Sequence, residues 1–238
     1  MRSSRPRPDP LDPGPAGFAH RGLHDGWDVP ENSLAAFEAA IEFGAGIECD
    51  LRLTADGHVV VFHDQDAARL CGKPHRISRS TLLDVSSFTV ADRRIPTLPT
   101  MLELVAGRVP LLMEIKIDRN VRRLAFALER GLAGYPGRFG VMSFDPRLVR
   151  QVKARMPSAL RGLVIRDRLS AVERSVALHV AAPDFLAVEH SALGKRWVTK
   201  ARQRMPVYGW TITSPAQRAQ AEVHADALIW EGDGRPRI

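Results

Sequence analysis

Carboxylates and a histidine alternate with apolar residues in the segment GIECDLRLTADGHVVVFHD, residues 46–64. Glu48 and Asp50 lie two residues apart in its first half, and its second half ends in His63-Asp64. Side chains of a β-strand alternate between its two faces, so a strand here points Glu48 and Asp50 the same way. Because buried carboxylates are costly unless they are paired or bind a metal, this segment indicates a functional site.

A third carboxylate follows in PLLMEIK, residues 110–116, where Glu114 and Lys116 share one face of an apolar strand. Three converging carboxylates with one nearby lysine suit a hard divalent cation with oxygen ligands, Mg²⁺ or Ca²⁺. The sequence therefore predicts a metal site formed by Glu48, Asp50 and Glu114, provided that the fold brings the two strands together.

The elements that must position these residues alternate regularly between strand-like and helix-like segments. The helical segments open with cap residues, such as Asn32-Ser33, Asp145-Pro146 and the capping box of Ser170 and Glu173. The expected strands lie in residues 17–22, 46–53, 110–116, 138–145, 161–167, 185–190, 207–212 and 227–231.

Eight strand–helix units predict an α/β protein with a closed (β/α)₈ TIM barrel. The returning strand of residues 58–64 and the segment up to Ile95 then form a short hairpin and loop insertion after the second strand. A doubly wound open sheet is the alternative, but no GxGxxG fingerprint supports it.

A barrel would gather the polar residues, because active sites of this fold lie at the carboxyl ends of the strands. The residues expected at those ends are His20, Arg21, Glu48, Asp50, Glu114, Lys116, Ser143, Arg166, Asp167, Glu189, His190 and Trp210.

The length of 238 residues and a hydrophobic content of 45% suit one large domain, predicted over residues 17–238. Residues 1–16 are predicted to be a disordered, Pro-rich arm and not a secretory signal. There is no apolar run of about 18 residues to span a membrane. Two cysteines, Cys49 and Cys71, make no disulfide framework, so a cytoplasmic location is expected.

The net charge of +7 and the pI of about 10.1 invite a nucleic-acid interpretation. The basic residues are scattered, however, and the sequence carries no zinc finger, helix-turn-helix or aromatic-interleaved basic strand, so no nucleic-acid partner is expected. A basic surface favours anionic substrates, or peripheral contact with anionic lipid headgroups. The oligomeric state is left open.

Several motifs, in this order and spacing, resemble the glycerophosphodiester phosphodiesterase family. They are FAHRG, PENSLAAFEAAIEFGA, IECDLRLTADGHVVVFHD, IPTLPTMLEL and LLMEIK, followed by MSFD and YGWTI. The resemblance covers the chain from residue 17 onward. It implies a phospholipase-C-like barrel that hydrolyses phosphodiesters.

The resemblance also implies roles for individual residues. His20 and His63 would act as acid and base, and Arg21 and Lys116 would face the phosphate. The three carboxylates would bind the metal, which agrees with the independent argument from their charge. A metal and two cations would stabilise the charge that develops on the phosphoryl oxygens.

Two candidate residues have alternatives of equal weight. Asn32 either caps a helix or contacts the substrate, and Trp210 either forms a wall of the site or belongs to the core. The family's last strand commonly ends in threonine-aspartate-x-proline, whereas this chain has IWEGDGRP, which affects the expected substrate selection. The short segment of residues 64–95 suggests an open pocket that tolerates varied alcohols.

The function expected from the sequence is a metal-dependent hydrolase that converts glycerophosphodiesters to an alcohol and glycerol 3-phosphate. The alternative among enzymes is a lysophospholipase-D-like hydrolase at a membrane surface, which an apolar rim with basic residues around the pocket would favour. The alternative outside enzymes is a barrel that binds phosphorylated ligands or lipid without turnover. Intact His20 and His63 argue against it, because a binding protein has no use for an acid–base pair.

Overall fold

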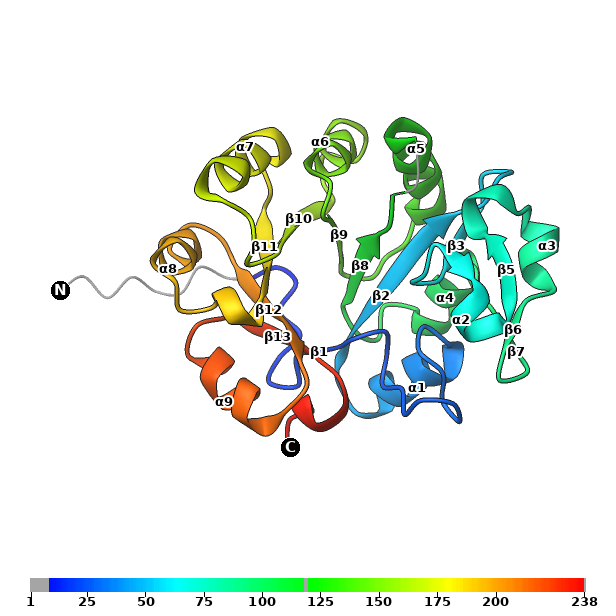
Figure 1. Ribbon diagram of the computed structural model, residues 1–238, viewed down its shortest axis with the longest axis horizontal. Coiled ribbons are helices and arrows are strands. Elements are labelled where there is room, and N and C mark those ends of the chain that lie inside the picture. Colours follow the sequence, from blue (N-terminus) through cyan, green and yellow to red (C-terminus); the bar gives the residue numbers. More distant parts are fainter. Residues whose placement is uncertain (1–8, 118–119, 238) are drawn as a thin grey trace.

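The computed structural model of the chain describes residues 9–117 and 120–237. Eight parallel strands form a barrel in the order β1, β13, β12, β11, β10, β9, β8, β2, and the pairing of β1 with β2 closes it (Figure 1). The strands are β1 (Phe18–Ala19), β2 (Gly46–Leu53), β8 (Leu111–Ile115), β9 (Phe139–Ser143), β10 (Leu160–Ile165), β11 (Phe185–Glu189), β12 (Val207–Ile212) and β13 (Ala227–Trp230). The predicted (β/α)₈ barrel is confirmed.

Helices between the strands cover the outside of the barrel (Figure 1). They are α1 (Leu34–Glu42), α4 (Leu98–Val105), α5 (Val121–Leu132), α6 (Pro146–Arg155), α7 (Ala171–Ala181), α8 (Arg196–Arg202) and α9 (Pro215–Glu222). The expected capping box is present at α7, where Ser170 and Glu173 satisfy each other's backbone N–H groups. Among the described residues, no helix combines the length and the apolar character that crossing a bilayer requires.

The insertion after β2 is a small lobe with its own apolar core. Strand β3 (Val59–Val61) returns antiparallel along β2, as the sequence predicted. The lobe then contains β4 (Asp66–Ala67), α2 (Ala68–Cys71), β5 (Lys73–Arg76), α3 (Leu82–Ser86), β6 (Thr89–Val90) and β7 (Arg93–Arg94). Its core residues are Val60, Phe62, Ala67, Ile77, Val85, Phe88, Val90 and Ile95. The lobe lies beside the barrel next to β2 (Figure 1).

The barrel interior has an apolar lower part and a charged upper part. Alternation along β8 points Leu112 and Glu114 to the same side, and Leu112 belongs to a buried cluster with Phe18, Phe185 and Tyr208. Asp50 and Glu114 are register partners on the neighbouring strands β2 and β8. The apolar cluster therefore supports a layer of carboxylates nearer the carboxyl ends of the strands.

Residues 9–16 differ from the disordered arm that the sequence predicted, whereas residues 1–8 lie outside the described residues. Leu11 is completely buried in the interior cluster, and a side chain at Gly140 would clash with it, since an added Cβ would lie 2.8 Å from Leu11 Cδ2. Tyr208 donates a hydrogen bond of 2.8 Å to Asp9, and Trp230 Nε1 donates one of 2.7 Å to the Ala16 carbonyl. The prediction was wrong here because a single leucine among prolines fills the bottom of the barrel.

We predict that Leu11→Ala lowers the free energy of unfolding by about 2–5 kcal/mol, the range for a leucine removed from a packed core. The matched control is Leu83→Ala, because Leu83 on α3 is 81% exposed, and this variant should change stability by less than about 0.5 kcal/mol. Urea denaturation measures both. Equal stabilities of the two variants would contradict the role of Leu11 as an interior residue.

Candidate active site

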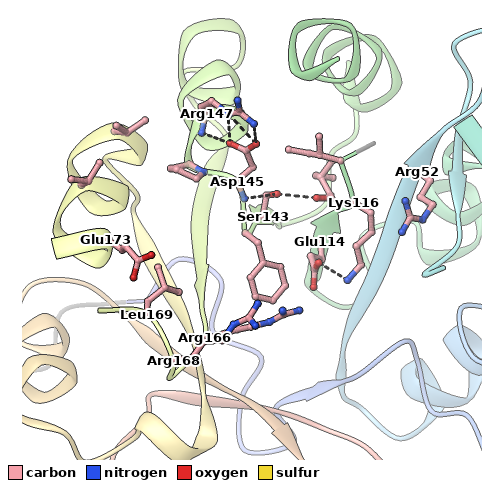
Figure 2. A pocket seen from close by; sticks show the side chains of 16 residues that line it. Arg52, Glu114, Lys116, Ser143, Asp145, Arg147, Arg166, Arg168, Leu169 and Glu173 are labelled. Carbon is pink, nitrogen blue, oxygen red and sulfur yellow. Dashed lines mark hydrogen bonds and ion pairs between the residues drawn. The ribbon is translucent and has the colours of Figure 1, made fainter. Parts of the chain in front are cut away.

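A cavity of about 1100 Å³ opens at the carboxyl ends of β8, β9 and β10 (Figure 2). Glu114 and Lys116 line it near the barrel axis, and Arg166 and Leu169 line it near α7. Glu48 and Asp50 are 1% and 0% exposed, and they do not line this cavity. The cavity thus meets the predicted metal ligands at Glu114.

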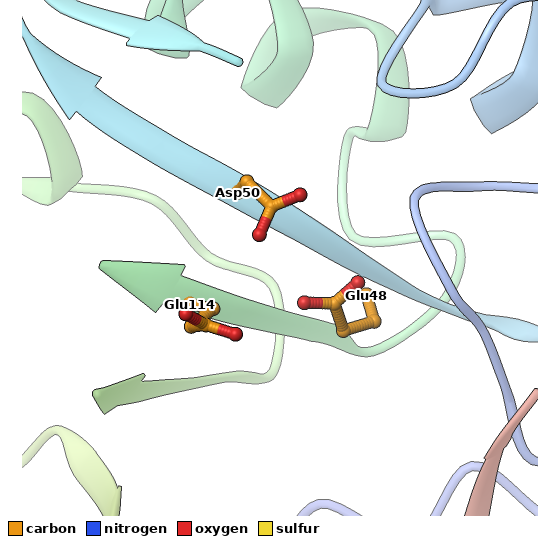
Figure 3. Close-up of side chains that lie close together, drawn as sticks. All are labelled: Glu48, Asp50 and Glu114. Atoms are coloured by element: carbon orange, nitrogen blue, oxygen red, sulfur yellow. The ribbon is translucent and has the colours of Figure 1, made fainter. Parts of the chain in front are cut away.

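The three predicted metal ligands are brought together. One carboxylate oxygen of each of Glu48, Asp50 and Glu114 lies within 4.8 Å of the others. Figure 3 shows the three side chains on β2 and β8, with their carboxylates turned toward a common space. All three are buried, so their mutual repulsion is weakly screened and a cation is required to offset it.

The pKa values of the three carboxyls reflect this crowding. Burial, reinforced by the charge of Asp50, raises the pKa of Glu48 to about 8. Burial also raises the pKa of Glu114, although Lys116 opposes the shift. Burial acts in the same direction on Asp50, but Lys116 and Arg21 hold the pKa of this carboxyl well below its ordinary value. The cations therefore keep Asp50 as the most strongly ionised member of the set.

Arg21 and Lys116 are the cations that neutralise the carboxylates. Lys116 Nζ forms an ion pair with Asp50 Oδ1 at 3.0 Å and a second one with Glu114. Arg21 Nε lies 3.3 Å from Asp50 Oδ2, and the Arg21 N–H donates to Glu48 Oε2 at 3.0 Å. Both cations that were expected to face the phosphate are thus at the carboxylates.

The donor set fits a divalent cation. Asp50 Oδ1 and Glu114 Oε1 are buried and accept no aligned hydrogen bond from the described part of the chain, although Lys116 is close enough for ion pairing. Carboxylate oxygens are ligand atoms that Mg²⁺ and Ca²⁺ prefer. Glu48, Asp50 and Glu114 could therefore hold such an ion.

Asn32 supports Asp50. Its amide group donates to Asp50 Oδ2 at 2.9 Å and accepts from the Asp50 N–H at 3.1 Å. The cap of α1 is Ser33, whose hydroxyl accepts from the Ala36 N–H, so the alternative that Asn32 caps this helix was wrong. Asn32 is only 3% exposed, and direct contact with a substrate stays a prediction.

His20 is held by a residue from the other end of the chain. Its Nδ1 donates to Glu231 Oε2 at 2.6 Å, and its Nε2 lies 3.9 Å from Glu48 Oε2. Burial lowers the pKa of His20, but the hydrogen bond to Glu231 and the charge of Glu48 outweigh it and raise the pKa above the ordinary value. Glu231 lies in the segment IWEGDGRP, and sequence reasoning connected this segment with substrate selection.

The position of Glu231 could have been found from the closure of the barrel. Strand β13 ends at Trp230, and β1 ends at Ala19, directly before His20. Ala19 and Trp230 are register partners, so the residues that follow them are neighbours. Chain closure was part of the predicted fold, but the pairing register was not.

The hairpin of β2 and β3 places His63 at the site. The Phe62 N–H donates to the Asp50 carbonyl at 2.9 Å, which fixes the chain just before His63. His63 Nδ1 donates to Asp64 Oδ1 at 2.7 Å, and Arg52 Nε donates to the His63 carbonyl at 2.8 Å. Burial, together with the charges of Lys116 and Arg21, lowers the pKa of His63 although Asp50 opposes the shift.

An ion-pair network that the sequence did not reveal joins the insertion to the site. Arg69 of α2 donates to Asp64 Oδ2 at 2.6 Å and to both carboxylate oxygens of Glu31. Glu31 also accepts from Arg21 Nη1 at 2.8 Å. The lobe is therefore tied to the residues next to both histidines, Arg21 beside His20 and Asp64 beside His63.

Trp210 lies at the mouth of the barrel against an aromatic neighbour. Its ring meets that of Phe144 edge to face, with centroids 5.6 Å apart. Its Nε1–H is buried and has no acceptor among the described residues. An unused buried donor is costly, so this group suits a ligand acceptor, and substrate contact by Trp210 stays a prediction.

The chain matches a family of known proteins over most of its length. The model of the glycerophosphoryl diester phosphodiesterase family matches residues 20–231, which contain every candidate site residue named above. A glycerophosphodiester phosphodiesterase of Caldanaerobacter subterraneus is 34% identical over 163 residues. That match covers 62% of this chain and 65% of the relative, just under two thirds of its length.

Solved structures with the same fold cover nearly the whole chain. A phosphodiesterase of Oleispira antarctica, in complex with the product sn-glycerol-3-phosphate, superposes with a TM-score of 0.82 at 22% identity and covers 92% of this chain and 94% of its own. A glycerophosphodiester phosphodiesterase of Thermotoga maritima has a TM-score of 0.74 at 26% identity, and the coverage is 90% and 92%.

We predict that Mg²⁺ or Ca²⁺ added to chelated protein raises the Tm by roughly 5–10 °C at a concentration of about 100 times Kd, because only the folded state binds the ion. Glu48→Gln and Glu114→Gln should weaken binding about tenfold or more, since each removes one charged ligand. Calorimetry and thermal unfolding measure both effects.

The control for the metal experiment is Glu103→Gln, because Glu103 is an exposed glutamate on α4. This variant should bind the ion as the wild type does. Equal affinity in all three variants would show that the ion binds elsewhere.

Proposed function

The chain belongs to the glycerophosphoryl diester phosphodiesterase family, and from this premise we propose that it is a metal-dependent phosphodiesterase. Its reaction is the hydrolysis of glycerophosphodiesters to an alcohol and glycerol 3-phosphate. Three buried carboxylates and two histidines lie together at the mouth of the barrel, and each histidine is hydrogen-bonded to a further carboxylate. This arrangement is the main support for the proposal. The bound product of the Oleispira antarctica enzyme supports the same class of substrate.

Glu48, Asp50 and Glu114 would hold the divalent ion, which would act as a Lewis acid on the phosphoryl oxygens. With such an ion bound, Glu48, Asp50 and Glu114 would need Lys116 and Arg21 less strongly as counterions. Lys116 and Arg21 would then be able to pair with the phosphodiester, a group that reacts slowly while its negative charge is unshielded. Their charge stabilises the phosphoryl oxygens most in the transition state, where negative charge builds up.

Proton transfer would be carried out by the two histidines. One removes the proton of the attacking hydroxyl, whose oxygen forms a bond to phosphorus. The other gives a proton to the alkoxide as the phosphorus–oxygen bond to the alcohol breaks. The attacking hydroxyl is that of water, or one of the substrate, in which case a cyclic phosphate forms and is then hydrolysed. Glu231 and Asp64 support this chemistry because each accepts from Nδ1 and leaves Nε2 available.

A second function, the lysophospholipase-D-like activity, has support from the cavity edge. Leu169 and Val176 line the cavity beside Arg166, and Val172 and Val176 on α7 are 73% and 58% exposed. An apolar strip next to basic side chains suits a lipid with one acyl chain. Peripheral contact with anionic lipid would follow from the same surface. A cytoplasmic location stays a prediction, supported by Cys49 and Cys71, which are both free.

We predict that the protein releases sn-glycerol 3-phosphate from glycerophosphodiesters of small alcohols only when a metal ion is present. An enzymatic assay for sn-glycerol 3-phosphate, with Mg²⁺ and Ca²⁺ tested in turn, measures this release. Phosphomonoesters should be poor substrates, because their extra negative charge approaches the carboxylates and they lack the second ester bond. Lysophospholipids belong in the same panel, and faster turnover of these would favour the second function. Full activity after exhaustive chelation would refute the metal-dependent mechanism.

Replacing either His20 or His63 by Ala should lower kcat by about 10²–10⁴-fold, as is typical when proton transfer is lost. Metal affinity should remain close to that of the wild type. The control is His179→Ala, because His179 is exposed on α7 and should leave kcat unchanged. A loss of metal binding in the His20 or His63 variants would instead identify the histidines as ligands.

A further inference from the structure

The cationic side chains that line the cavity differ in whether neighbouring oxygen atoms already bind them. Among the described residues, five cationic side chains line the cavity, and three of them are engaged by neighbouring oxygens. Lys116 pairs with Asp50 and Glu114, Arg147 forms several hydrogen bonds to Asp145, and Arg52 donates to a backbone carbonyl. The remaining two are Arg166 and Arg168.

Arg166 and Arg168 directly follow strand β10, at its carboxyl end, and both are exposed. Within residues 9–117 and 120–237, neither guanidinium group forms an ion pair or a hydrogen bond, although the Arg166 carbonyl accepts from the Leu169 N–H at 3.3 Å. The Arg166 guanidinium lies 4.5 Å from the centroid of the Phe144 ring, which orients it without neutralising its charge. Figure 2 shows both arginines extending into the cavity that Glu114 and Lys116 also line.

The carboxylates at this end of the cavity have other partners. Asp145 accepts from Arg147 and from the first backbone N–H groups of α6. Glu173 accepts from the Ser170 N–H in the capping box of α7, and its hydrogen bonds with Ser170, followed by the charge of Arg168, lower its pKa. Among the described residues, Arg166 therefore has no counterion and Arg168 has none within ion-pairing distance, and both line a cavity that reaches the proposed reaction centre.

We infer that Arg166 and Arg168 bind a second anionic group, carried by the alcohol that leaves the substrate. This inference rests on the proposed function and specifies its substrate class: glycerophosphodiesters of alcohols that bear a phosphate or carboxylate. Guanidinium groups bind such oxygens through paired N–H donors. Quaternary ammonium alcohols are commonly bound on a free aromatic face, and Arg166 already covers a face of Phe144, the aromatic residue among the described residues that line this cavity.

The test compares kcat/KM for three diesters: glycerophosphoinositol 4-phosphate, glycerophosphoinositol and glycerophosphocholine. The first two differ only in one phosphate group. We expect at least a tenfold preference for the phosphorylated compound at about 0.01 M salt, and choline should be the poorest alcohol. The preference should shrink at about 1 M salt, where the Debye length falls from about 30 Å to about 3 Å.

The double variant Arg166→Gln/Arg168→Gln should reduce the ratio between the first two diesters to near one. The matched control is Arg150→Gln/Lys153→Gln, which removes the same charge from exposed residues of α6 that do not line the cavity. The control should retain the ratio of the wild type. Thermal unfolding of both variants verifies that they are folded.

An unchanged ratio in the double variant, a wild-type ratio near one, or a preference for choline would overturn the inference and leave the proposed function intact. Absence of hydrolysis for every diester and metal would overturn the proposed function. In that case the Kd values of the same three compounds, measured by calorimetry on wild type and double variant, decide the inference. Tenfold tighter binding of the phosphorylated compound, lost in the double variant, supports it, and equal affinities overturn it.

Discussion

The repulsion among three buried carboxylates is the constraint on which the architecture of this site depends. Glu48, Asp50 and Glu114 share a space too small for three unpaired negative charges. Lys116 and Arg21 offset that charge from the side, and Asn32 fixes Asp50 through two hydrogen bonds. The ordered surroundings of the ligands thus follow from the electrostatic cost of bringing them together.

A hydrogen bond to a carboxylate positions each of the two histidines, although the two carboxylates come from different parts of the chain. In each case a carboxylate accepts the Nδ1 proton, and so sets the orientation of the ring. Asp64 is the next residue after His63, whereas Glu231 is 211 residues from His20 and reaches it because the last and first strands pair. Closure of the barrel is therefore a requirement of the catalytic geometry as well as of the fold.

The two sides of the barrel mouth differ in how their charges are used. On the side of the insertion, Arg69 and Glu31 connect the lobe to Asp64 and Arg21, so charges there are mutually satisfied. Arg69 is 48% exposed, so solvent weakens its ion pairs, and the network orients the residues beside the histidines more than it adds to stability. On the side of β10 and α7, Arg166 and Arg168 lie beside apolar residues and, among the described residues, have no carboxylate within ion-pairing distance. The second side remains available to a ligand.

The sequence by itself determined the strand–helix alternation, the eight parallel strands and the faces of Glu48, Asp50 and Glu114, because side-chain periodicity and capping are local properties. It could not determine contacts set by packing and register. Leu11 among prolines gave no local signal of burial, and Glu231 became a partner of His20 only through closure. Tertiary structure decided these contacts because they join segments whose separation along the chain carries no periodic pattern.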